Sequence, residues 1–246
     1  MALREQLESS GGWLFRWRGS LPLVIFALIL WVMRDFRYLG DSRRWNALWE
    51  YGCLAVSFCG LAIRAYTVGH APKNTSGRNV REQRADRLNT SGIYSIVRHP
   101  LYVGNFFVYL GVAMFAHVWW LVVICVLAYW LYCERIMLAE EFYLRGKFGC
   151  VFEQWAQRTP AFIADARRWQ PPDLPFSLKN VLRREYNNFF SVVLILFVLD
   201  GVGRYFAEGR IQLDPVWTIV FYVGFAIWIV LRTIKRNTEW LRVAGR

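Results

Sequence analysis

The sequence predicts an all-helical integral membrane protein, a single polytopic membrane domain over residues 1–246 with about six transmembrane helices. Hydrophobic residues make up 56% of the chain and aromatic residues 17%, above the roughly 45–50% apolar content of an ordinary soluble domain. Several apolar runs alternate with basic segments. A helix needs about 17–25 mostly apolar residues to cross a bilayer, so these runs are expected to be spans.

The first expected span, Leu21 to Met33, is short and must use flanking Trp, Tyr and Arg residues to reach both interfaces. Arg16 and Arg18 in front of it would also suit a signal peptide. However, the sequence RDFRYLG follows where a small-residue cleavage site would be needed, so we expect this segment to be retained. The second span runs from Leu48 to Val68.

The central run, Leu101 to Tyr132, is long enough for two spans with a break at Ala116-His117, and it therefore predicts a helical hairpin. The Pro-rich connector Trp169 to Pro175, WQPPDLP, then returns the chain to the membrane. Two further runs, Phe189 to Leu199 and Val216 to Leu231, predict two additional spans within the C-terminal segment 189–246.

Basic residues are unevenly distributed among the loops, and the net charge is +12. Most lie before the first span, between Gly69 and Pro100, between Glu134 and Asn188, or after the last span. The opposite loops hold only Arg34, Arg37, Arg43, Arg44, Arg204 and Arg210. Because cytoplasmic loops are enriched in Lys and Arg, this pattern places both termini and both long polar segments in the cytoplasm.

The sequence argues against nucleic-acid binding, a metal site and a disulfide. Nucleic-acid binding is not expected, because the basic residues lie in loops between spans and no recognition motif accompanies them. A metal site or disulfide is not expected either. The five cysteines show no CxxC or His-paired spacing, and four of them lie inside apolar runs, where small buried residues are common.

The stretch GIYSIVRHPLYVG, Gly92 to Gly104, enters the hairpin. Proline disfavours a helical residue before it and suits the first helical position, so a helix is expected to begin at Pro100. Its free N–H groups beside Arg98 and His99 suit an anion. Gly104 and Gly111 share a helix face and would let another helix or a ligand approach closely. The alternative is an interfacial anchor with a helix-packing groove.

The second polar stretch, ERIMLAEEFYLRGKFG, leaves the hairpin on the same membrane face and should continue as a helix. Glu141 shares a face with Glu134, whereas Glu140 points about 100° away, so the two adjacent glutamates cannot serve one site in the same way. The alternative for Glu141 is a solvated ion pair with Arg145 worth a few tenths of a kcal/mol. The following KFGCVFEQW predicts an amphipathic surface helix.

RHPLYVG followed, across a hairpin, by ERIMLAEEFYLRGKFGCVFEQWAQRTPAFI resembles the paired signature of the membrane methyltransferases related to isoprenylcysteine carboxyl methyltransferase and the phospholipid N-methyltransferases. The match covers about residues 92–163. It implies S-adenosylmethionine as cofactor, held at the cytosolic ends of the hairpin, and a lipid acceptor that enters from the bilayer. The sequence departs from the family at Phe152 and Trp155, where Tyr is usual, and at Ala164, where a second Pro is common.

By matching position, the resemblance assigns catalysis to Arg98 and Glu141. It assigns cofactor binding to His99, Pro100, Tyr102, Gly104, Glu140, Glu141, Leu144 and Phe148. Methyl transfer from a sulfonium is an in-line displacement, so the protein must mainly hold donor and acceptor together and exclude water. We expect Arg98 to steer or neutralise an anionic acceptor, and one of the two glutamates to position the cofactor with His99 and Tyr102.

The basic segment between Gly69 and Gly92 bears on the acceptor. Lys73, Arg78 and Arg81, together with Arg98, are expected to bind a lipid phosphate; the alternative is a positive-inside loop against anionic headgroups. The stretch PKNTSGRN…LNTSGIYSIVRHPLY also resembles the bacterial branch of the family that methylates the 1-phosphate of lipid A, which implies the bacterial inner membrane. Prenylcysteine carboxylate and the amine of phosphatidylethanolamine are alternative acceptors, and the amine would need a base to remove its proton.

Two other function classes remain alternatives. Sterol-type reductases resemble the same region but use NADPH; the adjacent glutamates followed by Leu and Phe-Gly favour the methyltransferases. A transporter or membrane scaffold is suggested by Glu50, Arg64 and Asp200, which lie in or near apolar runs. Each lies within reach of a span end and can pair locally, and no inverted repeat is visible. The sequence does not predict an oligomeric state.

Overall fold

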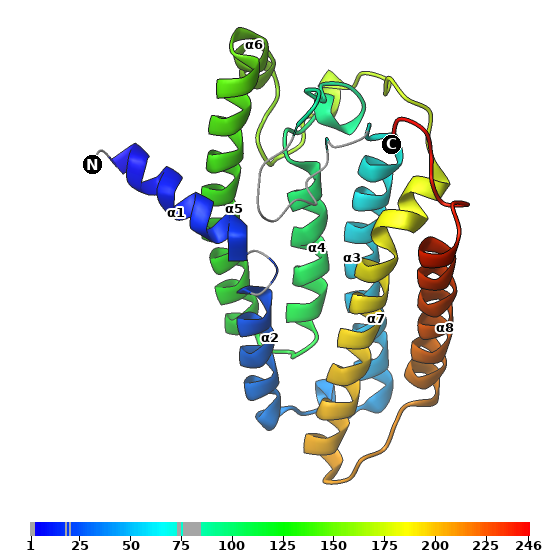
Figure 1. Ribbon diagram of the computed structural model, residues 1–246. Coiled ribbons are helices and arrows are strands. Elements are labelled where there is room, and N and C mark those ends of the chain that lie inside the picture. Colours follow the sequence, from blue (N-terminus) through cyan, green and yellow to red (C-terminus); the bar gives the residue numbers. More distant parts are fainter. Residues whose placement is uncertain (1–2, 18, 20, 73–74, 76–84) are drawn as a thin grey trace.

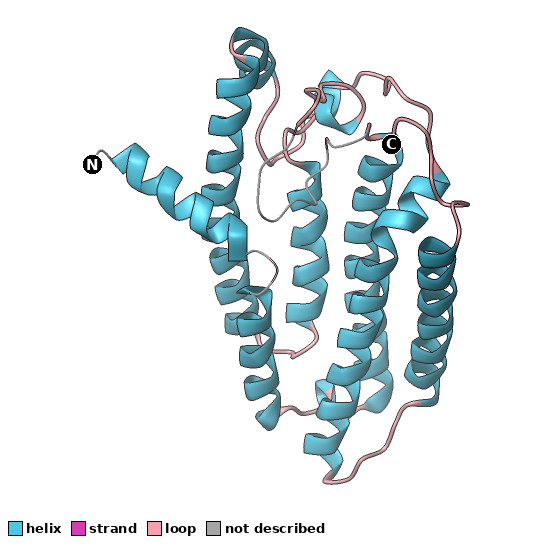
Figure 2. Ribbon diagram, in the orientation of Figure 1, coloured by secondary structure: helices cyan, strands magenta, loops and turns pink. Residues whose placement is uncertain are grey.

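The computed structural model describes residues 3–17, 19, 21–72, 75 and 85–246. Regular secondary structure in these ranges is helical, apart from one isolated bridge between Gly92 and Gln170. Figure 2 shows helices joined by loops. The α-helices are α1 (Leu3–Trp17), α2 (Leu21–Val32), α3 (Arg43–His70), α4 (Pro100–Met114), α5 (Trp119–Phe148), α6 (Cys150–Arg158), α7 (Leu178–Glu208) and α8 (Pro215–Asn237). The all-helical prediction is confirmed.

Four described helices, α3, α5, α7 and α8, are each long and apolar enough to cross a membrane. A fifth candidate is the pair Ser10–Trp17 and Pro22–Asp35, which bends by 68°. Helix α4 is apolar but has 15 residues, about 22 Å at 1.5 Å per residue, less than a typical hydrocarbon core. Figure 1 shows α4 upright among the longer helices. The count of six spans therefore stays a prediction.

The predicted hairpin and its break are confirmed. Helix α4 begins at Pro100 and ends at Met114, and α5 begins at Trp119. Between them His117 adopts φ +59°, a left-handed conformation that no helix continues through. Helix α5 then runs on to Phe148, as expected for the second polar stretch, and ends at Gly149 with φ +53°. Both ends of the hairpin thus lie at one end of the bundle (Figure 1).

Helix α6 has the predicted amphipathic character. Phe152 on one face is 1% exposed, and the indole N–H of Trp155 donates to the carbonyl of Tyr94 at 3.2 Å. This face covers the segment that leads into the Arg-His-Pro turn.

The predicted fifth span, Phe189 to Leu199, is the centre of the longer helix α7. Both C-terminal helices have capped ends. Ser177 accepts a hydrogen bond from the N–H of Asn180 at the start of α7, and Gly209 ends that helix with φ +68°. Asp214 accepts from the N–H groups of Val216 and Trp217 at the start of α8. Such caps satisfy backbone groups that a helix end otherwise leaves unpaired.

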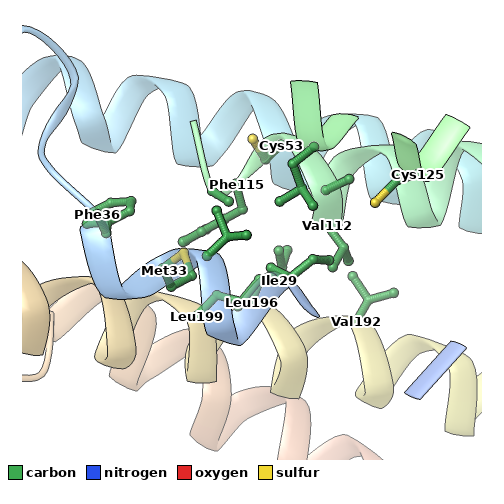
Figure 3. Close-up of a cluster of buried hydrophobic side chains, with 14 of the residues drawn as sticks. Ile29, Met33, Phe36, Cys53, Val112, Phe115, Cys125, Val192, Leu196 and Leu199 are labelled. Carbon is green, nitrogen blue, oxygen red and sulfur yellow. The ribbon is translucent and has the colours of Figure 1, made fainter. Parts of the chain in front are cut away.

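The hydrophobic core joins the spans of the bundle (Figure 3). It contains buried residues from α2, α3, α4, α5 and α7 and the segment after α2, among them Ile29, Met33, Phe36, Cys53, Val112, Phe115, Cys125, Val192, Leu196 and Leu199. The face of α4 that carries Gly104 and Gly111 lies directly against α3. A Cβ at Gly104 would be 2.9 Å from the carbonyl oxygen of Gly60, and one at Gly111 would be 2.4 Å from that of Cys53. The predicted close approach is therefore to a helix.

The ionisable residues that suggested a transporter all have partners. Glu50 is 2% exposed and accepts from Asn46 at 2.6 Å and from the indole N–H of Trp217 at 2.8 Å. Asp200 pairs with Arg204 at 2.7 Å, and Arg64 pairs with Glu185 at 2.8 Å. Local pairing is thus confirmed for Glu50 with Asn46 and for Asp200 with Arg204. The partner of Arg64 instead lies on another helix, 121 residues further along the chain.

Candidate active site

Backbone hydrogen bonds hold the Arg-His-Pro turn, residues 98–100, in place. His99, with φ −122° and ψ 60°, is not helical, as expected for a residue before proline. The N–H of Arg98 donates to the carbonyl of Pro160 at 2.9 Å, and that of His99 to the carbonyl of Ala161 at 3.2 Å. The segment after α6 therefore folds back and fixes the turn against α5.

His99 lies between the two adjacent glutamates of α5. Its Nε2 is 3.0 Å from Oε1 of Glu141, and its Nδ1 is 3.6 Å from Oε2 of Glu140. The hydroxyl of Tyr102 donates to Oε1 of Glu140 at 2.8 Å, and Nη1 of Arg98 donates to Oε2 of Glu141 at 3.3 Å. Each glutamate thus has its own set of partners, consistent with their 100° separation on the helix.

The alternative for Glu141, a solvated ion pair with Arg145, is wrong. Arg145 forms its ion pair with Glu153 of α6, at 3.3 Å between Nε and Oε1, and both side chains are about half exposed. Glu141 instead contacts Arg98 and His99, and its side chain is 22% exposed. The packing of the turn onto α5 brings these two cationic partners closer than the residue one helical turn away.

Burial lowers the pKa of His99, but hydrogen bonds and charge attraction from Glu140 and Glu141 outweigh it and raise the pKa above its ordinary value. A histidine whose pKa is raised on folding adds stability that is fully present below about pH 6.5, its unfolded pKa. That stability is lost as the pH rises through the raised pKa. The protonated imidazolium, with one carboxylate at each nitrogen, is therefore the form that the site favours.

A pH dependence of stability follows. The difference in melting temperature between the wild-type protein and His99→Gln, measured in detergent, is expected to be largest at pH 6 and to shrink toward pH 9. His117→Gln is the control, because burial lowers the pKa of His117 and its difference should run the other way. A His99→Gln difference that is constant across this range would contradict the proposed imidazolium.

An aromatic layer supports the cluster from the membrane side. The hydroxyl of Tyr129 donates to the carbonyl of Tyr102 at 2.6 Å, and the ring of Phe106 lies 5.7 Å from that of Tyr129. Buried Tyr129, Cys133 and Met137 of α5 form the centre of this layer. It fixes the first turn of α4, and hence Tyr102, relative to the glutamates.

The remaining residues assigned by resemblance lie outside the polar cluster. Pro100 is buried at the first position of α4. Gly104 faces α3, where its Cβ position is 2.5 Å from Cγ of Arg64. Leu144 and Phe148 follow Glu141 along α5 and are partly buried, with Nζ of Lys147 5.9 Å from the centre of the Phe148 ring. Lys73, Arg78 and Arg81 lie outside the described residues.

A small cavity lies beside the turn, between the end of α3, residues 87–94 and the connector 172–174. Its polar lining includes His70, Arg87, Asn89, Ser91 and Tyr94. The carbonyl of Gln170 accepts from the N–H of Gly92 at 3.0 Å, and Arg87 pairs with Asp173 at 2.5 Å. Sequence reasoning missed this cavity because its walls come from three distant segments, and the only local signal was the Pro-rich connector.

The model of the phospholipid methyltransferase family matches residues 72–150. This part of the chain is thus similar to the membrane methyltransferases. The family region contains the turn, the hairpin and both glutamates, and thus confirms the resemblance given by the two motifs. It ends at Cys150, so the helices α7 and α8 lie outside it.

Among the curated relatives, one has a methyltransferase name and two are named metal-resistance proteins. The chain is 37% identical over 76 residues to a protein-S-isoprenylcysteine O-methyltransferase of Schizosaccharomyces pombe, which is 31% of this chain and 32% of the relative. It is 33% identical to the nickel-cobalt-cadmium resistance protein NccN of Alcaligenes xylosoxydans xylosoxydans, over 60% of this chain and 62% of the relative. It is 32% identical to the cobalt-zinc-cadmium resistance protein CzcN of Cupriavidus metallidurans, over 60% of this chain and 61% of the relative.

The chain therefore spans less than two thirds of the length of these relatives. No solved structure matches it.

The residues of the family region fit S-adenosylmethionine as a ligand. The cofactor presents an amino group, a carboxylate, a sulfonium and ribose hydroxyls. The carboxylates of Glu140 and Glu141 would be the acceptors for its cationic and hydroxyl groups. Nε of Arg98 is a buried donor with no acceptor among the described residues. A buried, unpaired guanidinium N–H is costly, so a ligand anion at this position would satisfy it.

Proposed function

We propose that this protein transfers a methyl group from S-adenosylmethionine to an anionic oxygen of a membrane lipid, with a lipid phosphate as the acceptor. One observation carries the proposal: Arg98, His99, Tyr102 and the two glutamates form one cluster at the end of an apolar hairpin. A polar cofactor can reach this position from the aqueous side, and a lipid headgroup can reach it from the bilayer.

The protein's role in such a transfer is to align the reactants and exclude water. The bound cofactor supplies an electrophilic methyl group. Glu140, held by Tyr102, and Glu141, held by His99, are suited to fix the cofactor through its cationic and hydroxyl groups. The aromatic layer below keeps water from the membrane side. Correct alignment of two reactants can by itself lower a barrier by about 7–11 kcal/mol.

We infer that the acceptor is an anion from the hydrogen bonds that the two glutamates already accept. An ammonium acceptor must first lose a proton to a base. Glu141 already contacts a guanidinium and an imidazole, and Glu140 accepts from a tyrosine hydroxyl. Both carboxylates thus already accept hydrogen bonds from the protein, whereas an ionised phosphate oxygen needs no base. The unpaired Nε of Arg98 supports a role for this residue in binding such an anion.

Two further points of the proposal rest on the loops and on one relative. The excess of basic residues in the long polar segments supports an orientation with this site in the cytoplasm, as for a protein of the bacterial inner membrane. The isoprenylcysteine carboxylate is a second candidate acceptor, supported by the yeast relative. It is also an anionic oxygen and would use Arg98 in the same way.

The test is incubation of the purified protein in lipid with S-adenosylmethionine that carries a labelled methyl group. Mass spectrometry of extracted phospholipids, lipid A and prenylcysteine should show one added CH₂ unit on a phosphorylated lipid. Arg98→Ala should lose this transfer and keep cofactor binding, because it removes the acceptor's partner. Arg145→Ala, which removes an exposed arginine of α5, is the control and should stay active.

Transfer to prenylcysteine alone would replace the phosphate acceptor by the second candidate. If no acceptor is methylated and the cofactor does not bind, the methyltransferase proposal is wrong. NADPH binding would then favour a reductase, and directional flux in proteoliposomes would favour a transporter.

A further inference from the structure

A buried ion pair joins α3 and α7, two helices outside the family region, and a hydrogen bond extends it to α4. Arg64 of α3 donates through Nε and Nη2 to the two carboxylate oxygens of Glu185 in α7, at 2.8 and 3.1 Å. Its Nη1 donates to Oδ1 of Asn105 in α4 at 2.6 Å. The side chains of Arg64 and Glu185 are 13% and 9% exposed. One guanidinium thus links three helices.

The backbone is arranged to let this guanidinium reach α4. Helices α3 and α4 meet at Gly60 and Gly104, and Cγ of Arg64 occupies the space beside Gly104. Glu185 also accepts from Nδ2 of Asn188 at 2.8 Å, so both of its oxygens are bonded. A paired and fully bonded charge of this kind is difficult to shift, because separating the partners would leave an uncompensated buried charge.

Asn105 lies close to the Arg-His-Pro turn, in the first two turns of α4. It is three residues after Tyr102, so the two side chains project about 60° apart on α4. Tyr102 faces the glutamates of α5, whereas Gly104 faces α3. Asn105 therefore projects between these two directions, at the junction of α3, α4 and α7.

Arg64 decides which way the amide of Asn105 points. A guanidinium only donates hydrogen bonds, so the amide oxygen must face Arg64 and the amino group must face away from it. Within the part of the chain that the structure describes, no acceptor is recorded for this amino group. Two N–H donors of fixed direction are therefore presented beside the turn.

We propose that Arg64 and Glu185 are positioning residues, which orient Asn105 so that its amide donates to the anionic headgroup of the acceptor lipid. The inference rests on the proposed function and extends it: the C-terminal helix α7, outside the family region, contributes to acceptor binding. It assigns Asn105 to the acceptor and leaves the cofactor to the Glu140 and Glu141 cluster.

The test separates acceptor binding from cofactor binding and from folding. For Asn105→Ala, the KM for the lipid is expected to rise about tenfold, the loss typical of a hydrogen bond to a charged group. The Kd for S-adenosylmethionine should be unchanged. Asn105→Ser keeps a small donor, so its KM for the lipid should lie between those of the wild-type protein and Asn105→Ala. Melting temperatures in detergent show whether each variant folds.

A charge-swapped variant, Arg64→Glu with Glu185→Arg, shows whether the ion pair orients the amide of Asn105 or only stabilises the fold. It restores an ion pair, but a glutamate at position 64 accepts hydrogen bonds and would turn the amide of Asn105 around. We expect its melting temperature to recover relative to Arg64→Glu alone while the KM for the lipid stays high. Arg204→Lys, at a similarly buried pair at the other end of α7, should leave the KM unchanged.

Wild-type KM values in Asn105→Ala, or recovery of both KM and melting temperature in the swapped variant, would overturn the inference. Absence of methyl transfer in the wild-type protein would instead overturn the proposed function on which it rests.

Discussion

Glu141→Gln is expected to lower the rate of methyl transfer by about 100-fold, the scale of loss produced by a misplacement of about 1 Å among reacting groups. The substitution keeps the shape of the side chain and removes its charge. Arg98 and His99, which Glu141 contacts at 3.3 and 3.0 Å, then lose their shared counter-charge. Single-turnover transfer of a labelled methyl group measures the effect without the contribution of product release.

Glu134→Gln is the matched control, because Glu134 lies two turns earlier on the same helix and is exposed. It should transfer methyl groups at the wild-type rate. If Glu141→Gln were as active as Glu134→Gln, Glu141 would have no role in the site. Normal cofactor binding with slow transfer would place its effect on Arg98 and the acceptor, whereas lost cofactor binding would place it on the cofactor.

Gly60→Ala is expected to lower the free energy of unfolding by about 1–3 kcal/mol, the usual cost of overpacking a well-packed core. A Cβ at this position would lie 2.3 Å from the carbonyl oxygen of Gly104 and 2.7 Å from the backbone nitrogen of Val108. Because these are backbone atoms, no side-chain rotation can relieve the clash, and α3 and α4 must move apart. Denaturant unfolding in detergent measures the change.

Gly52→Ala tests the same substitution in the same helix without the clash, since no atom lies within 4 Å of its Cβ position. It should be neutral or stabilising by up to about 1 kcal/mol, because alanine has the higher helix propensity. Equal effects of the two substitutions would show that the packing of α3 on α4 does not limit stability.

Local sequence determined where α4 begins and where the long apolar helices lie. Proline fixes its own φ and restricts the residue before it, so the start of α4 at Pro100 could be predicted. The apolar pattern located α3, α5, α7 and α8, and the seven-residue spacing of Gly104 and Gly111 predicted a face for close approach. The motifs of the two polar stretches resembled those of the family, and this resemblance pointed to Arg98, His99 and the glutamates.

Only the tertiary structure decided which groups meet. A helix-surface rule favours Arg145 as the partner of Glu141, yet the folded chain brings Arg98 and His99 to it. The cavity beside the turn, the link from Arg64 to Glu185 and the identity of the helix that faces Gly104 join segments far apart in the chain. Backbone preferences act over a few residues, whereas a charge pairs with whichever partner helix packing brings within hydrogen-bond distance.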